Sequence, residues 1–112
     1  MVVCKDIDIR DSLELSRFVE NLSIKFPYKD VFTANTPIKI GMHSHDDYEA
    51  RLFLEGKATF YIGNVQYNCV PGSYIEIDPE VKHSFVSDKN SSLRVLRFFS
   101  KEQKWVANFC PD

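Results

Sequence analysis

The sequence predicts an all-β domain, a small barrel or sandwich, with one helix near the N-terminus. Most of the chain after Val31 alternates turn residues with short segments rich in β-branched and aromatic residues, about seven segments in all. Only one segment, close to the N-terminus, has apolar residues at helical spacing. The 112 residues contain no linker or internal repeat, which indicates a single domain over residues 1–112, large enough to bury a core.

The expected helix begins at Asp11 or Ser12, either of which can cap it. Glu14 then lies in the first turn, where acidic side chains favour the helix N-terminus. Pro27 prevents the helix from extending further. We expect the helix to cover the domain with its apolar face, which is formed by Leu15, Phe18, Val19 and Leu22.

The expected strands follow in quick succession and are separated by turn signals. Gly63-Asn64 forms a two-residue loop of the kind found in primed hairpin turns. Pro71-Gly72, Asp78-Pro79 and Asp88-Lys89-Asn90 mark further turns. The strands expected from this punctuation cover residues 38–45, 48–54, 58–62, 65–69, 73–77, 84–86 and 92–99.

Composition excludes several classes of function. The formal net charge of −2 provides no basic surface for nucleic acid. No apolar run approaches the ~20 residues that span a bilayer, and residues 1–6 become charged too early for a secretory signal. Cys4, Cys69 and Cys110 are far apart and form no C-x-x-C pair, so we expect reduced thiols. We therefore expect a cytoplasmic protein that contacts neither nucleic acid nor membrane.

All three histidines fall into one pattern with a glutamate. His43 and His45 are two residues apart and would project from the same face of one strand. Glu49 has the same parity on the next strand, after a turn at residues 46–47 that we expect to be solvated. His83 is distant in sequence and must come from another strand across the barrel. Together these residues are a plausible set of ligands for one divalent transition metal.

This ligand set also constrains the metal and its substrate. Four protein ligands leave two positions open on an octahedral ion, which suits a bidentate oxygen ligand or a substrate with dioxygen. Catalytic zinc usually takes three protein ligands in tetrahedral geometry, so iron(II), nickel(II) or manganese(II) fits this nitrogen-rich, six-coordinate site better. One carboxylate on a divalent ion leaves the centre positively charged, which favours an anionic small-molecule substrate.

The run H-x-H-x-x-x-E-x-x-x-x-x-x-G over residues 43–56 resembles the first motif of the cupin superfamily. Pro37 stands where the family usually has a leading glycine. Gly72, Pro79 and His83 match the second motif loosely, since the stretch from Pro79 to His83 is one residue short and lacks the motif's glycine. The resemblance implies a cupin-type small β-barrel (a double-stranded β-helix, jelly-roll-like) that binds a metal.

Within the cupins, the chain resembles the acireductone dioxygenase family over roughly residues 37–109. The similarity lies in residues 43–51, 82–85, 97–99 and 105–109. It implies an enzyme of methionine salvage that cleaves an enediol ketone with dioxygen. With iron(II) the expected products are formate and the 2-oxo acid, whereas nickel(II) would give a cleavage that releases carbon monoxide.

The same resemblance gives roles to three further residues. Arg51 is the expected catalytic residue, which neutralises or orients the bound enediolate, unless it only pairs with Glu55 or Asp47. Phe85 lies two residues after His83, so the two side chains would be on the same face of the strand. Phe85 would then line the substrate pocket or belong to the core. Trp105 would close the pocket or contact the substrate tail, or anchor the C-terminal segment.

Two other functions remain open at this point. One is a non-catalytic cupin that binds a metal or small ligand. The other is a different cupin enzyme, such as a sugar isomerase or an aromatic-ring dioxygenase, although the lack of further histidines argues against sugar chemistry. The exposed strand edges leave both a monomer and an oligomer open.

Overall fold

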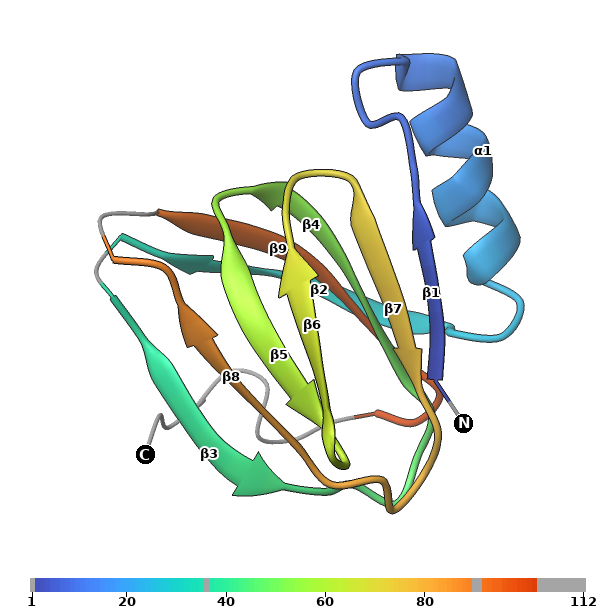
Figure 1. The fold of residues 1–112 in the computed structure, drawn as a ribbon. Helices are drawn as coiled ribbons and strands as arrows, with labels where there is room; N and C mark the ends of the chain where they lie inside the picture. The colour runs from blue at the N-terminus through green and yellow to red at the C-terminus, as the bar shows by residue number, and fades with distance from the viewer. Residues whose placement is uncertain (1, 36, 90–91, 103–112) are drawn as a thin grey trace.

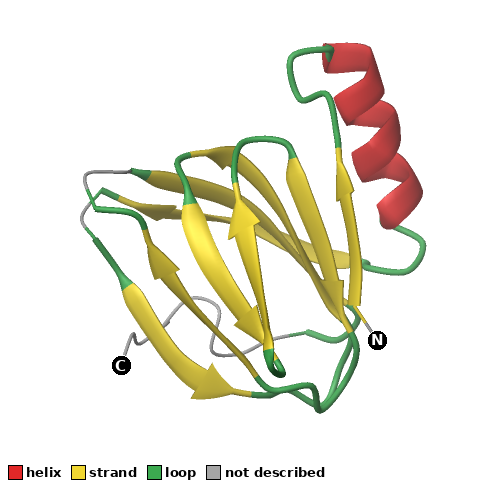
Figure 2. Ribbon diagram, in the orientation of Figure 1, coloured by secondary structure: helices red, strands yellow, loops and turns green. Residues whose placement is uncertain are grey.

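The computed structural model describes residues 2–35, 37–89 and 92–102. In this part of the chain, two antiparallel sheets face each other and one helix lies outside them (Figure 1, Figure 2). The all-β fold with a single N-terminal helix is therefore confirmed. The elements are β1 (Val2–Asp6), α1 (Ser12–Leu22), β2 (Tyr28–Ala34), β3 (Lys39–His43), β4 (Glu49–Glu55), β5 (Ala58–Ile62), β6 (Val65–Cys69), β7 (Ser73–Ile77), β8 (His83–Ser87) and β9 (Leu93–Phe99).

The order of the strands places the sequence motifs opposite one another. The first sheet has the order β1-β7-β4-β9-β2, and the second has the order β3-β8-β5-β6. Glu49 and Arg51 therefore lie on the central strand of the first sheet. In the second sheet His43 of β3 is directly opposite His83 of β8. The two histidines brought together by this register are 40 positions apart in the sequence, so long-range strand pairing builds this part of the site.

The space between the sheets holds the main hydrophobic core. Its inward side chains come from alternate strand positions, because successive residues of a strand point to opposite faces. Phe53 and Phe60 meet edge to face here, with ring centroids 6.1 Å apart. The fully buried members are Phe53, Ala58, Phe60, Ile62, Cys69, Ile75, Ile77, Leu93 and Val95.

Helix α1 closes the outer face of the first sheet, as its amphipathic pattern predicts. The Asp11 side chain accepts hydrogen bonds from the backbone of Leu13 and Glu14, each at 3.1 Å, so the predicted N-cap is confirmed. Phe18 packs edge to face on Tyr74, with ring centroids 4.8 Å apart. No helix in the described part of the chain is long and apolar enough to span a membrane. The buried side chains beneath α1 are Phe26, Ala50, Leu52, Tyr74 and Phe98.

Two features differ from the sequence-based expectations. Strands β1 and β2 were not predicted, although they complete the first sheet. The first predicted strand was expected to run from residue 38 to residue 45, but β3 ends at His43. The helix, in contrast, ends at Leu22, the last residue of its predicted apolar face.

Candidate metal centre

His43 and His83 are each held by a hydrogen bond to nearby backbone. In each ring Nδ1 donates to the backbone carbonyl two residues earlier, Gly41 at 2.7 Å and Val81 at 2.9 Å. Because a carbonyl oxygen only accepts, these bonds place the ring proton on Nδ1 in the neutral imidazole. The lone pair is then on Nε2, which is the form that ligates metals.

The three imidazoles converge on one point. Their ligand atoms all lie within 4.8 Å of one another. Two nitrogens bound to one ion at about 2.1 Å lie roughly 3.0 Å apart in cis positions and about 4.2 Å apart in trans positions, so the rings would move together by up to about 2 Å to enclose an ion. Nε2 of His83 is buried and has no hydrogen-bond partner among the described residues. A buried nitrogen of this kind is costly unless a ligand satisfies it.

Glu49 stands between two of these rings and is almost fully buried. Its Oε2 lies 3.5 Å from Nε2 of His45, and its Oε1 lies 3.5 Å from Nε2 of His83. Oε1 also accepts a hydrogen bond of 2.6 Å from Arg51. Burial alone would raise the pKa of Glu49, but the attraction of Arg51 and the contacts with His83 and His45 outweigh it and lower the pKa to about 2. The carboxylate is therefore ionised at neutral pH.

His45 reaches the site from a loop rather than from the strand that the sequence predicted. The chain leaves β3 at His43, and the His45 carbonyl then accepts a 2.7 Å hydrogen bond from the backbone of Glu80. Glu80 itself has a φ of 65°, which is unusual for a residue other than glycine. Burial lowers the pKa of His45 to about 4, against the attraction of Glu49. His45 is therefore neutral near pH 7, as a ligand must be.

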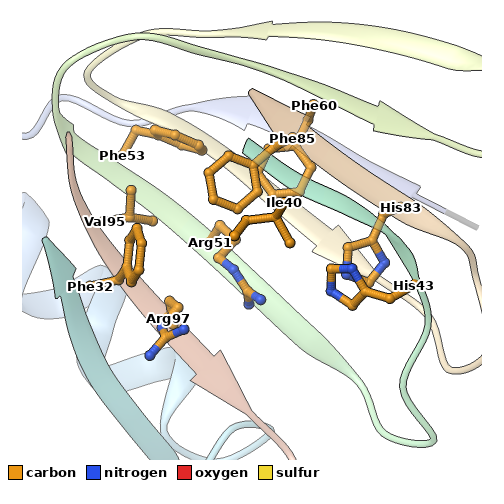
Figure 3. A pocket seen from close by; sticks show the side chains of 10 residues that line it. All are labelled: Phe32, Ile40, His43, Arg51, Phe53, Phe60, His83, Phe85, Val95 and Arg97. Atoms are coloured by element: carbon orange, nitrogen blue, oxygen red, sulfur yellow. The ribbon is translucent and has the colours of Figure 1, made fainter. Parts of the chain in front are cut away.

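A small cavity adjoins the histidines between the two sheets (Figure 3). Its volume of about 20 Å³ holds one or two water molecules. Figure 3 shows the rings of His43 and His83 close together at one side and Phe32 at the other, with Arg51 between them. The lining residues are Phe32, Ile40, His43, Arg51, Phe53, Phe60, His83, Phe85, Val95 and Arg97.

Phe85 lies in the wall of this cavity, on the same face of β8 as His83. Its ring stacks on Phe60 with centroids 5.1 Å apart and meets Phe32 edge to face at 6.4 Å. This packing fixes an apolar surface next to the polar end of the cavity. Trp105, the other aromatic residue predicted to contact substrate, lies outside the described residues.

Arg51 is buried, and its ion-pair partner differs from the two carboxylates considered from the sequence. This partner is Glu49, two residues earlier on the same face of β4. Burial lowers the pKa of Arg51, and the Glu49 carboxylate opposes this shift. The guanidinium also lies over the ring of Phe99, 5.3 Å from its centroid. Arg51 therefore fixes Glu49 while facing the cavity.

Sequence reasoning missed three charged residues near the site. Arg97 lines the cavity from β9 and is bound by Asp30 of β2 through two hydrogen bonds of 2.8 and 2.6 Å. Asp47 was expected in a solvated turn but is only 2% exposed. Burial and the neighbouring Glu49 raise the pKa of Asp47. The available signal was Arg97 itself, a charged residue in the apolar second half of β9.

Sequence comparison matches the model of the ARD/ARD' family to residues 38–107. The acireductone dioxygenase of Aquifex aeolicus is 32% identical over 71 residues, which cover 60% of this chain and 39% of that protein. The acireductone dioxygenase of Hydrogenobaculum sp. is 35% identical, with coverage of 60% and 39%. The chain thus spans well under half the length of these relatives.

Solved structures with a similar fold include a cadmium-containing acireductone dioxygenase from Bacillus anthracis. It superimposes with a TM-score of 0.75 at 16% identity, over 94% of this chain and 81% of that one. A cupin superfamily protein from Desulfitobacterium hafniense gives a TM-score of 0.59 at 11% identity, over 88% and 76%. At such identities the similarity establishes the cupin fold. The family model covers well over half of the chain, and the chain therefore belongs to the ARD/ARD' family.

Proposed function

We propose that this chain is a metal-dependent dioxygenase of the acireductone dioxygenase type, which cleaves an enediol ketone with dioxygen. The observation that carries the proposal is the convergence of three imidazoles on a buried, ionised carboxylate beside a cavity with a guanidinium. Membership of the ARD/ARD' family supports it. The substrate is a small anion, and dioxygen is the second reactant.

In this proposal His43, His45, His83 and Glu49 hold one divalent transition metal. The residues fit such an ion, because their ring nitrogens converge and the buried Nε2 of His83 has no hydrogen-bond partner in the described part of the chain. Iron(II) is the first choice, and nickel(II) or manganese(II) are alternatives for the same nitrogen-rich, six-coordinate site. The bound ion would supply a positive centre that chelates the two oxygens of an enediolate.

The protein's own residues would bind and orient the substrate around this centre. Arg51 holds one oxygen of Glu49 and presents its cationic group to the cavity, where it orients the enediolate. Phe85 and its stacked partner Phe60 exclude water from the apolar side. Trp105 keeps its predicted role as a contact for the substrate tail.

A direct test is to load the protein anaerobically with iron(II) or nickel(II), add the enediol ketone, and admit air. We expect oxygen uptake, loss of the enediol absorbance, and formate with iron(II). The His83→Ala variant should lose both the metal and the turnover. The Lys82→Ala variant, altered at the exposed neighbouring residue, should retain both. The absence of turnover with either metal in a protein that carries one ion per chain would overturn the proposal.

One observation favours the second candidate, a non-catalytic cupin that binds a metal and a small ligand. The cavity of about 20 Å³ is far smaller than the pockets that usually surround an organic substrate. In this case the protein would keep its metal and bind small anions such as glycolate, yet consume no oxygen with the enediol. The same oxygen-uptake experiment therefore separates the two functions.

A further inference from the structure

Three charged residues form a row across the inner face of the first sheet. Asp30 of β2 is directly opposite Arg97 of β9, and Arg97 is directly opposite Arg51 of β4. Both arginines line the cavity. The row links the edge strand β2 to the central strand β4, which also carries Glu49. Asp30 lies outside the residues that match the family model.

The two arginines are an unfavourable pair unless their charges are compensated. Like charges directly opposite each other on paired strands repel, and both guanidinium groups are nearly buried. A carboxylate compensates each arginine. Arg51 donates a 2.6 Å hydrogen bond to Glu49. Arg97 donates hydrogen bonds to both carboxylate oxygens of Asp30. A bidentate pair of this kind fixes the direction of the guanidinium as well as its charge.

These four groups contribute to the charge that a ligand in the cavity meets. Glu49 and Asp30 contribute −2 and the two arginines contribute +2, so the charges of these four groups sum to zero before a metal binds. A divalent ion raises the total to +2. Without Asp30 the total would be +3, and a dianion would gain more from this change than a monoanion, because the attraction scales with the charge of the ligand.

We propose that Asp30 is a positioning residue that sets the charge selectivity of the site. Asp30 holds Arg97 against the cavity wall and neutralises the charge of Arg97. It thereby reduces the preference of the metal-loaded site for dianions over monoanions. The proposal rests on the metal site of the proposed function, but not on turnover.

The test compares two small bidentate ligands of different charge on the nickel(II)-loaded protein. Glycolate is a monoanion and oxalate is a dianion, and calorimetric titration gives a dissociation constant for each. A unit charge acting over about 10 Å at an effective dielectric constant of about 20 changes the binding of one further ligand charge on the order of tenfold. We therefore expect Asp30→Asn to shift the ratio of the two affinities toward oxalate on the order of tenfold.

Three further variants make this result specific. Asp30→Glu restores the charge and should return the ratio to near the wild-type value. Arg97→Gln removes the opposite charge and should shift the ratio toward glycolate, which provides a second test if Asp30→Asn folds poorly. Asp88→Asn, the same chemical change at an exposed residue, should leave the ratio unchanged.

Failure of this inference can be distinguished from failure of the proposed function. A ratio that stays within about twofold of wild type in both Asp30→Asn and Arg97→Gln would overturn the role of Asp30, even if the enediol is cleaved. A shifted ratio in a protein that consumes no oxygen would support the role of Asp30 and overturn the dioxygenase. Only folded, metal-loaded molecules bind either ligand. Partial unfolding of a variant therefore leaves the ratio of the oxalate and glycolate affinities unchanged.

Discussion

Replacement of Glu49 by glutamine should destabilise the metal-free protein strongly. Glutamine preserves the shape of the side chain but removes the negative charge that compensates Arg51. The Arg51 guanidinium would then be buried beside Arg97 with no carboxylate at 2.6 Å. Glu49 is 1% exposed and Arg51 is 7% exposed, so solvent cannot take over the role of the missing charge.

Removal of one partner of a buried ion pair typically costs about 3–5 kcal/mol. A domain of this size usually has a free energy of unfolding of about 5–15 kcal/mol, so Glu49→Gln should remain folded but only marginally stable. The double variant Glu49→Gln with Arg51→Met removes both charges. It should recover much of the loss, because no isolated charge remains buried.

Urea unfolding of the metal-free variants measures these free energies. Glu76→Gln is the matched control, because Glu76 also bonds to a cation, Lys25 at 2.9 Å, but that lysine is half exposed. We expect this control to lose about 1 kcal/mol or less. Glu49 would not compensate the buried charge of Arg51 if Glu49→Gln lost no more free energy of unfolding than the control. The same conclusion would follow if the additional Arg51→Met substitution made the protein still less stable.

Two further predictions concern pH and backbone geometry. Burial lowers the pKa of His45 from 6.5 to about 4, so the unfolded chain takes up a proton over this range that the folded metal-free chain does not. Stability should therefore fall as the pH falls from 6.5 to 4, by up to about 3 kcal/mol from this residue; a constant free energy of unfolding between pH 7 and 5 would contradict this. Gly56→Ala should lower the free energy of unfolding by more than about 2 kcal/mol. The new Cβ would lie 2.1 Å from the Ser92 carbonyl oxygen, and the backbone here has a φ of 80°. Gly63→Ala, with a φ of 59° and open space around it, should cost only about 1 kcal/mol in the same urea assay.

Much of the fold follows from local patterns. The strands β5, β6 and β7 have the predicted bounds, because clear turn residues separate them. The helix was predicted from its cap and its apolar spacing. Strand β2 was missed because Lys29 and Asp30 interrupt its alternation. Asp30 faces inward only because Arg97 is directly opposite, and that partner is 67 residues away.

In the site, too, sequence spacing predicts some features, whereas others depend on contacts between distant residues. The motif places Glu49 and Arg51 on one face of a strand, and their contact confirms this parity. The sequence predicted that His83 comes from a strand across the barrel, and this was wrong: β8 is distant in sequence, but it pairs directly with β3 in the same sheet and places His83 opposite His43. The loop position of His45 depends on the backbone bond from Glu80, and the burial of Asp47 depends on the packing of its surroundings. Neither can be inferred from neighbouring residues.

Three imidazoles are proposed to bind one metal ion in this protein. X-ray absorption spectroscopy of the nickel(II)-loaded protein counts imidazole ligands directly through their multiple-scattering signature. We expect about three imidazoles on one six-coordinate nickel per chain, and about two in a His43→Ala variant that still retains metal. A nickel ion coordinated by no imidazole, or an unchanged spectrum after the substitution, would contradict this proposal.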